Sequence, residues 1–322
     1  MIWVLGEKRE GVISPVTYEA LGAGRGLANP LKEGLNLILI GEGLENLSEG
    51  LLRKADRIYL LEHRLLDSYT CDGYKKSLAN FLKDKDISAL IIPGTSTGRE
   101  IAPFLSVFLN LPCSTNITGI EVVNNTIQVR RSLYGGKVIE TLVSEGGAII
   151  TIMPGVFNEL QALEKEGEVI KVEAKIAEED IKVRSIETIR QGGKKDITEA
   201  KVLVSGGRGV GGAEGFKILE ELASVLGGFT AASRGAVDAG WRPHAVQVGQ
   251  TGKVVSPKLY IACGISGAPQ HMAGMRNSGY VIAINKNPNA PIFREADLGI
   301  VGDIFEVIPE LLQEIKRPKE NG

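Results

Sequence analysis

The chain has 322 residues, of which 43% are hydrophobic and 24% are charged, and its formal net charge is −2. This length predicts two domains, each with enough apolar residues for its own core. The nearly balanced charge excludes the basic surface that nucleic acid binding requires, and no run of about 18 apolar residues could cross a membrane.

The start of the chain and its three cysteines indicate the cellular compartment. Residues 2–5 already form an apolar run typical of a strand, so we expect neither a signal peptide nor a transit peptide. Cys71, Cys113 and Cys263 are isolated in the sequence, and we expect buried, reduced side chains. The sequence therefore predicts a cytoplasmic protein.

The first half of the chain alternates apolar runs with amphipathic ones. The runs at 35–40, 57–61 and 87–92 predict buried strands, and the segments 15–27, 44–54, 69–83 and 99–109 predict helices. Strands that alternate with helices indicate a parallel sheet covered on both faces. This block is predicted to be one domain, residues 1–190.

The pattern changes after Pro112. Apolar and polar residues alternate at 126–132, 137–143 and 148–153, which predicts antiparallel strands, and the segments 169–176 and 182–189 continue this character. The polar, glycine-bearing segment that follows is predicted to be a linker, residues 191–200.

A second α/β block, residues 201–322, follows the linker. Strands are predicted at 201–204, 259–263, 280–285 and 298–301, and a helix with one apolar face at 213–226. Gly227 and Gly228 supply the stop signal of this helix. Asp303 is predicted to cap the N-terminus of a final helix that runs towards Ile315.

Three glycine-rich turns mark the second block as the ligand-binding one. They are residues 205–212, 247–252 and 264–271. Glycine lets the backbone approach a ligand closely, and a turn that leads into a helix directs free N–H groups at an anion. Three such turns in one domain favour a dinucleotide over a small metabolite.

Two glycine clusters in the first block are weaker candidates. Gly22 to Gly26 has the letters of a dinucleotide motif, but it follows a helical pattern and not a strand, so we interpret it as a helix terminus. Gly94 to Gly98 lies between a strand and a helix, where either an anion site or an ordinary capped turn would fit.

The polar residues around the glycine turns of the second block suit the parts of such a ligand. Ser266, Gly267 and Ala268 form a turn, and Pro269 suits the first helical position. Arg208 could neutralise phosphates. Asn285 and Asp303 lie at strand ends, where adenosine hydroxyls are read. Further donors for a polar ring system are Ser233, Arg234, Gln250, Thr251 and His271.

These motifs resemble the alpha subunit of electron transfer flavoproteins. The resemblance rests on residues 205–209, 232–234, 237–240, 247–252, 259–262, 264–267, 270–271, 273–275 and 283–286, and more weakly on 98–103 and 116–121. It implies an N-terminal nucleotide-binding-like α/β domain and a C-terminal Rossmann-like domain with a parallel sheet that binds FAD. Pro269 departs from the family pattern, because an apolar residue with a backbone N–H is common there.

The resemblance also implies a heterodimer with a beta subunit, on which the first domain packs. Carried over by position, the residues near the pyrophosphate are Arg208, Ser266, Gly267, Ala268, Pro269 and Gln270. Those near adenosine are Asn285, Asp303 and Ile304. Those around the isoalloxazine are Ser233, Arg234, Val248, Gly249, Gln250, Thr251 and His271, of which His271 is expected to donate towards O2 of the ring.

The implied activity is electron transfer without a catalytic residue or a metal. FAD would accept electrons from acyl-CoA or related dehydrogenases of fatty acid β-oxidation and pass them to a quinone reductase or another acceptor, through an anionic semiquinone that Arg234 and His271 stabilise. One alternative is a flavin-bifurcating member that uses NADH and a second FAD in the beta subunit. Another is an NAD-dependent enzyme on a similar fold.

Overall fold

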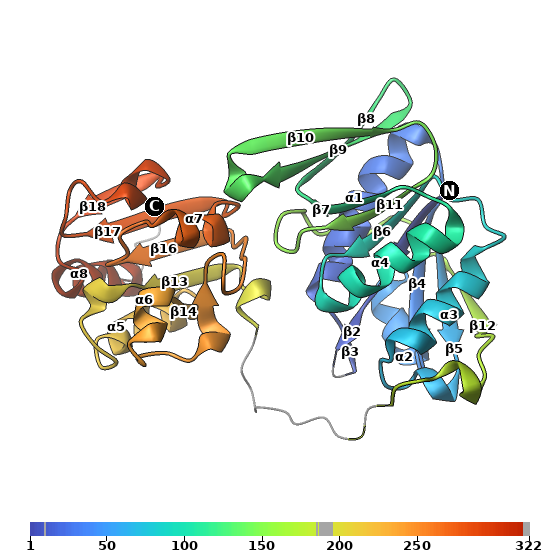
Figure 1. Cartoon of the computed structure of the whole chain (residues 1–322), viewed down its shortest axis with the longest axis horizontal. Helices are drawn as coiled ribbons and strands as arrows, with labels where there is room; N and C mark the ends of the chain where they lie inside the picture. The colour runs from blue at the N-terminus through green and yellow to red at the C-terminus, as the bar shows by residue number, and fades with distance from the viewer. Residues whose placement is uncertain (10, 185, 187–195, 318–322) are drawn as a thin grey trace. The chain divides into compact units, whose positions relative to one another are not determined.

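The computed structural model describes residues 1–9, 11–184, 186 and 196–317 (Figure 1). The chain divides into two compact units, each of which is described here by itself. Unit 1 comprises residues 1–133 and 139–193, and unit 2 comprises residues 134–138 and 194–322. No helix among the described residues is long and apolar enough to cross a membrane.

Unit 1 is built, within its described residues, on a sheet of seven parallel strands in the order β12-β5-β4-β1-β6-β11-β7 (Figure 1). The strands are β1 (Ile2–Leu5), β4 (Leu35–Gly41), β5 (Arg57–Glu62), β6 (Ala89–Pro93), β7 (Cys113–Ile117), β11 (Ala148–Ile152) and β12 (Glu168–Glu173). The short strands β2 (Lys8–Arg9) and β3 (Val12–Ile13) form an antiparallel pair of their own.

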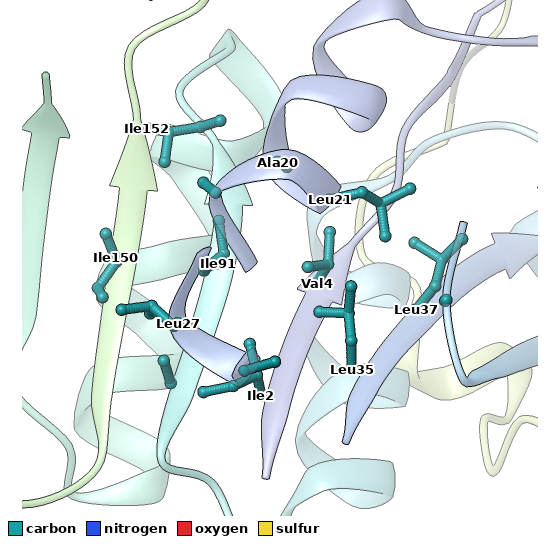
Figure 2. Packing of buried hydrophobic residues seen from close by; sticks show 14 of the residues in the cluster. Ile2, Val4, Ala20, Leu21, Leu27, Leu35, Leu37, Ile91, Ile150 and Ile152 are labelled. Carbon is teal, nitrogen blue, oxygen red and sulfur yellow. The ribbon is translucent and has the colours of Figure 1, made fainter. Parts of the chain in front are cut away.

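Helices cover both faces of this sheet, as the alternation of strands and helices predicts. α1 (Pro15–Leu31) packs on one face, and Figure 2 shows its residues Ala20, Leu21 and Leu27 against strand residues of β1, β4, β6 and β11. α3 (Cys71–Leu82) and α4 (Ser96–Leu109) pack on the other face, and the short helix α2 (Glu45–Ser48) follows β4. Successive strand residues enter opposite cores, because strand side chains alternate between the two faces.

The antiparallel strands predicted after Pro112 are only partly present. β8 (Gly119–Val123) and β9 (Thr126–Leu133) are antiparallel, and β10 (Val138–Ser144) lies next to β9. The prediction was wrong for β11 and β12, which pair in parallel in the main sheet. All five residues of β11 are buried, because helices or other segments cover both faces of the parallel sheet. An alternation of buried and exposed residues is therefore absent from this strand. Residues 182–184 and 186 form no strand, and the rest of the predicted strand at 182–189 lies outside the described residues.

Unit 2 contains, in its described part, a sheet of six parallel strands in the order β15-β14-β13-β16-β17-β18. The strands are β13 (Val202–Gly206), β14 (Phe229–Ser233), β15 (Gln247–Val248), β16 (Leu259–Cys263), β17 (Tyr280–Asn285) and β18 (Leu298–Val301). Counted from β13, the order is 3-2-1-4-5-6, the arrangement of the Rossmann fold. The Rossmann-like fold expected of this block is therefore confirmed.

Helices cover both faces of the second sheet too. α5 (Phe216–Val225) and α8 (Ile304–Lys316) share one core with α6 (Arg234–Asp238), and α7 (Pro269–Met275) packs on the opposite face through Met275. Three local predictions are confirmed. Gly227 ends α5 with a positive φ of 65°, Pro269 begins α7, and Asp303 caps α8 by accepting a hydrogen bond from the Phe305 amide (3.0 Å).

The segment between the two sheets is described only in part. Residues 191–195 of the predicted linker lie outside the described residues, whereas Ile197 and Ala200 are buried in the core of unit 2. The domain limits at residues 190 and 201 stay a prediction. Only Cys263 of the three cysteines is fully buried, and Cys71 and Cys113 are half-buried, because both lie at element ends near the surface.

The glycines at 22–26 lie inside α1 and do not terminate it, so that interpretation was wrong. The reason is close packing. A Cβ on Gly22 would stand 2.0 Å from the Asn158 carbonyl oxygen, and a Cβ on Gly24 would stand 2.7 Å from Leu35 Cδ1. Glycine here lets a helix approach its neighbours, at some loss of intrinsic helix stability. The sequence pattern alone does not separate this use of glycine from a stop signal.

Two alanine substitutions in α1 test this interpretation. Gly22→Ala should destabilise the protein by about 2 kcal/mol or more, because the added methyl group overlaps backbone atoms. Gly26→Ala is the matched control, since a Cβ there meets nothing within 4 Å. It should stabilise the helix by about 0.5–1 kcal/mol. Urea unfolding midpoints measure both changes, and equal midpoints would contradict the packing role of Gly22.

Candidate functional site

The site is built where two loops of unit 2 meet, after β13 and after β16. These strands are neighbours at the centre of the sheet, and the chain leaves them towards opposite sides, so a crevice is expected at their carboxyl ends. The Gly207 amide donates to the Cys263 carbonyl (2.9 Å), and the Gly209 amide donates to the Gly264 carbonyl (3.0 Å). A Cβ on Gly207 would stand 2.3 Å from that Gly264 oxygen, so the contact requires glycine.

The loop after β16 is shaped for a tight turn into α7. Gly267 has a φ of +87°, and a Cβ on it would stand 2.3 Å from the backbone nitrogen of Ile292. The Ile292 amide in turn donates to the Ser266 carbonyl (3.1 Å). The side chains that this turn leaves exposed are those of Ser266, Ala268, Pro269 and Gln270. The turn therefore offers polar groups and backbone to a ligand without bulky side chains.

Arg208 supplies a cation beside this crevice. It lies directly after Gly207, its side chain is exposed, and its Cγ lies 3.0 Å from where a Cβ on Gly235 would stand. The aliphatic part of the Arg208 side chain therefore packs against the start of α6. Among the described residues, no carboxylate pairs with its guanidinium. An unpaired guanidinium next to a glycine crevice suits phosphate oxygens.

The other predicted cation, Arg234, lies at the start of α6. Its Nε lies 3.1 Å from a carboxylate oxygen of Asp238, one helical turn further on, and 66% of the arginine side chain is exposed. The preceding residue, Ser233, ends β14 and makes no capping hydrogen bond with its side chain. The arginine charge is therefore partly balanced by a carboxylate that the sequence analysis did not consider.

The turn after β15 joins α7 through backbone contacts. The Gln250 amide donates to the Gln270 carbonyl (2.7 Å), and a Cβ on Gly274 would stand 2.4 Å from the Gly249 nitrogen. Gln247, which sequence reasoning missed, is 2% exposed and donates through Nε2 to Thr251 Oγ1 (3.2 Å). The Thr251 hydroxyl is thereby held as an acceptor and keeps its own proton for donation. A polar residue at a buried strand position was the signal for Gln247.

His271 is buried in α7 with both ring nitrogens next to protein oxygens. Nε2 lies 2.9 Å from the Tyr260 hydroxyl, and Nδ1 lies 3.1 Å from the Val248 carbonyl. Burial lowers the pKa of His271 to about 4, so the ring is neutral at physiological pH. Both ring nitrogens thus have a protein partner in this structure, and the expected donation towards the flavin stays a prediction. The fully buried Tyr260 was also missed, since nothing local marks it.

The residues predicted for adenosine have structural partners of their own. Asn285 donates through Nδ2 to the Ile265 carbonyl (2.8 Å), which ties the end of β17 to the loop after β16. Asp303 caps α8 and pairs with Lys286 (2.8 Å), and this pairing lowers the pKa of the aspartate. Ile304 is buried in the core beneath α8. Asn285 is thus attached to the loop after β16. Asp303 and Ile304 lie further away in the sheet order, after the end of the edge strand β18.

The glycine turn of unit 1 at Gly94 to Gly98 is an ordinary capped turn. Thr95 Oγ1 accepts a hydrogen bond from the Gly98 amide (3.1 Å) and donates to Glu7 Oε1 (2.5 Å). A carboxylate beside the helix start disfavours an anion. The capped turn, and not the anion site, is therefore the interpretation that the geometry favours.

Comparisons with known proteins match both units. The model of the electron transfer flavoprotein domain matches residues 2–177, and that of the electron transfer flavoprotein FAD-binding domain matches residues 196–276. The chain is similar to the electron transfer flavoprotein subunit alpha of Thermoanaerobacterium thermosaccharolyticum, with 44% identity over 99% of this chain and 98% of the relative. The same subunit of Bacillus subtilis is 41% identical over 98% and 97%. A protein of Anaerotignum propionicum named acryloyl-CoA reductase electron transfer subunit beta is 32% identical over 99% and 96%.

The residues of unit 2 fit the FAD of that family model. At the centre of the sheet, glycines let the loops after β13 and β16 lie in direct backbone contact where a Cβ would collide, and an unpaired arginine lies beside them. Both features suit the pyrophosphate of a dinucleotide. The Thr251 hydroxyl and the exposed turn before α7 add further polar groups in the same unit.

Protonation of His271 should make the protein acid-sensitive. Its pKa falls from 6.5 to about 4 on folding, so the unfolded chain takes up the proton first as the pH drops. The stability that neutral, buried His271 contributes is fully present above about pH 6.5. As the pH falls towards 4, the free energy of unfolding should decrease by about 3 kcal/mol at most. Urea unfolding at several pH values should show this loss in the wild type and a smaller one in His271→Asn. The same pH dependence in both proteins would contradict the assignment, since carboxylates are common to both.

Proposed function

Because this chain belongs to the electron transfer flavoprotein alpha-subunit family, whose second domain binds FAD, we propose that it is the FAD-carrying subunit of a heterodimeric electron carrier. Proteins of this family carry electrons and are not catalysts of substrate conversion. The observation that supports the proposal most strongly is the glycine-dependent backbone contact between the loops after β13 and β16, inside the segment that the FAD-binding family model matches.

The proposed roles of the individual residues follow the position of each along the crevice. Arg208 and residues 266–270 hold the pyrophosphate, which the unpaired guanidinium and the exposed turn support. Asn285, Asp303 and Ile304 line the adenosine end. Ser233, Arg234, residues 248–251 and His271 surround the isoalloxazine ring.

FAD, when bound, supplies reversible one-electron chemistry that no amino acid side chain provides. The part of the chain in this chemistry is electrostatic. Arg234 would place a positive charge near the ring and so would favour negative charge on it, and the Thr251 hydroxyl would donate its proton towards it. Asp238 moderates the charge of Arg234 through their ion pair. These residues would set how readily the flavin holds a single electron.

The proposed partners are a beta subunit, an acyl-CoA or related dehydrogenase as donor, and a quinone reductase or another acceptor. The name of the Anaerotignum relative, an electron transfer subunit of an acryloyl-CoA reductase, supports a link to CoA-ester redox chemistry such as fatty acid β-oxidation. We place the protein in the cytoplasm, because all three cysteines are described and none forms a disulfide. An NAD-dependent enzyme is set aside, since the matched domain is an FAD-binding one.

The remaining alternative is a flavin-bifurcating complex that uses NADH and a second FAD in the beta subunit. The cofactor count separates it from a simple carrier. The chain should be co-expressed with its beta subunit, purified, and its flavin measured from the absorption spectrum. We expect one FAD per heterodimer for the simple carrier and two, with direct reduction by NADH, for the alternative. Absence of flavin from the purified heterodimer would contradict both.

Substitutions at Arg234 test redox tuning apart from binding. Arg234→Ala should keep FAD bound but should lower the equilibrium constant for one-electron reduction to the anionic semiquinone about tenfold, which corresponds to about 1.4 kcal/mol of lost charge stabilisation, and so should lower the semiquinone yield. Arg234→Lys should recover part of the yield, because charge matters more than shape here. The measurement is a reductive titration followed by absorption.

Asp238→Asn is the matched control for these variants, because it removes the partner of Arg234 and leaves the cation. It should yield at least as much semiquinone as the wild type. A normal yield in Arg234→Ala with FAD fully bound, or a yield in Asp238→Asn as low as in Arg234→Ala, would refute the electrostatic role.

A further inference from the structure

The outer face of α4 in unit 1 is apolar, whereas the outer face of a surface helix is normally polar. Pro103, Phe104, Val107 and Phe108 are exposed there, and Val107 is 84% exposed. The opposite face of the helix lies in the core, against one face of the sheet (Figure 1). A single exposed apolar residue is ordinary, but four of them on successive turns indicate a contact surface. We call these four residues the α4 face.

The two aromatic rings of the α4 face are held side by side. Phe104 and Phe108 are one turn apart, with ring centroids 6.1 Å apart and ring planes inclined by 18°. The ammonium of Lys75, on α3, lies 5.1 Å from the centroid of the Phe104 ring and holds this ring from the side of α3. Because both rings are already placed, little side-chain entropy is lost when another surface packs on them.

The two ends of α4 carry opposite charge. Arg99, in the first turn, is exposed, and its Nε donates to the Thr95 carbonyl (3.3 Å). No carboxylate in the described part of the chain pairs with its guanidinium, and the neighbouring Glu100 accepts a hydrogen bond from the Tyr69 hydroxyl (2.7 Å). The helix ends before Asn110, and its last turn contains no basic side chain. The negative end of the helix dipole is therefore not balanced by a cation of its own helix.

A second copy of α4, packed antiparallel about a twofold axis, complements these features. A twofold axis repeats every contact, so Phe104 of each copy would meet Phe108 of the other copy. Each Arg99 would then lie at the C-terminal end of the opposite helix, where a cation is favourable. A helix packed in parallel would instead place Arg99 beside the positive end of its partner. The charges of the α4 ends thus favour an antiparallel copy.

We propose that the α4 face is a self-association surface, through which two copies of the heterodimer pair about a twofold axis. The inference goes beyond the proposed function and needs no flavin. Stable complexes bury about 1,600 Å² of surface in total, and the outer face of one helix supplies much less. The association is therefore weak, with a dissociation constant of about 10–100 µM.

Sedimentation of the purified, FAD-loaded heterodimer at increasing concentration measures this association. The wild-type mass should approach twice the heterodimer mass as the concentration rises from about 1 µM to about 500 µM. Phe104→Arg and Phe108→Glu should each raise the dissociation constant at least about tenfold, because each variant places a charge against a ring of the other copy twice.

A one-to-one mixture of these two variants tests the antiparallel geometry. In the mixed pair, one contact joins the new cation at position 104 to the new carboxylate at position 108, and the other contact joins two unchanged rings. The mixture should therefore associate within about fivefold of the wild type, although neither variant associates well with itself. Val12→Arg is the matched control, because Val12 is an exposed apolar residue of the same unit that lies on β3. It should leave the dissociation constant unchanged.

Three results would overturn the proposal. The first is a wild-type heterodimer that stays single at the highest concentration, and the second is a mixture that associates no better than its components. The third is loss of the beta subunit from the variants, which would make the α4 face part of the heterodimer interface. Because the substituted side chains are exposed, the urea unfolding midpoints of the variants should match that of the wild type.

The flavin content separates this inference from the proposed function. FAD per heterodimer should be the same in every variant, because α4 lies in unit 1 and the matched FAD-binding domain lies in unit 2. Absence of FAD from a heterodimer that associates normally would contradict the proposed function alone. An FAD-loaded heterodimer that does not associate would contradict the self-association surface alone.

Discussion

The site of this protein depends on the contact between two loop backbones, after β13 and after β16. Gly207 and Gly209 donate their amides across to the chain at Cys263 and Gly264, and no side chain could be placed on Gly207 without collision with that loop. Because the two strands are adjacent and the chain departs from them in opposite directions, the Rossmann arrangement places ligand binding at the carboxyl ends of these strands, between their loops. The cation of Arg208, the turn into α7 and the amide of Asn285 are all attached to these two loops.

The two units show how the same sheet arrangement supports different sites. In unit 1 the strands β5, β4, β1 and β6 repeat the order of β15, β14, β13 and β16, so an equivalent position exists between β1 and β6. There, however, Glu7 follows β1 and accepts a hydrogen bond from Thr95, which follows β6. Unit 1 thus places a carboxylate where unit 2 has glycine and arginine. A phosphate-bearing ligand would be repelled from the first position and attracted to the second.

Sequence reasoning succeeded where the signal is local. Pro269 at the start of α7, Asp303 as the cap of α8 and Gly227 at the end of α5 each act through their own backbone neighbours, and their roles could be read from short segments. It failed where the deciding contact is distant in the chain. The pairing of β11 within the parallel sheet and the packing of Gly22 on Asn158 follow from tertiary contacts, and so does the partnership of Tyr260 with His271. Periodicity within one segment carries no information about such partners.

The most direct measurement of the central claim is a crystal structure of the heterodimer with FAD bound. The account predicts flavin density in unit 2, with the pyrophosphate between the loops after β13 and β16 and within hydrogen-bond distance of their backbone. Density at the carboxyl ends of β1 and β6 in unit 1, or a pyrophosphate away from Gly207 and Gly264, would contradict it.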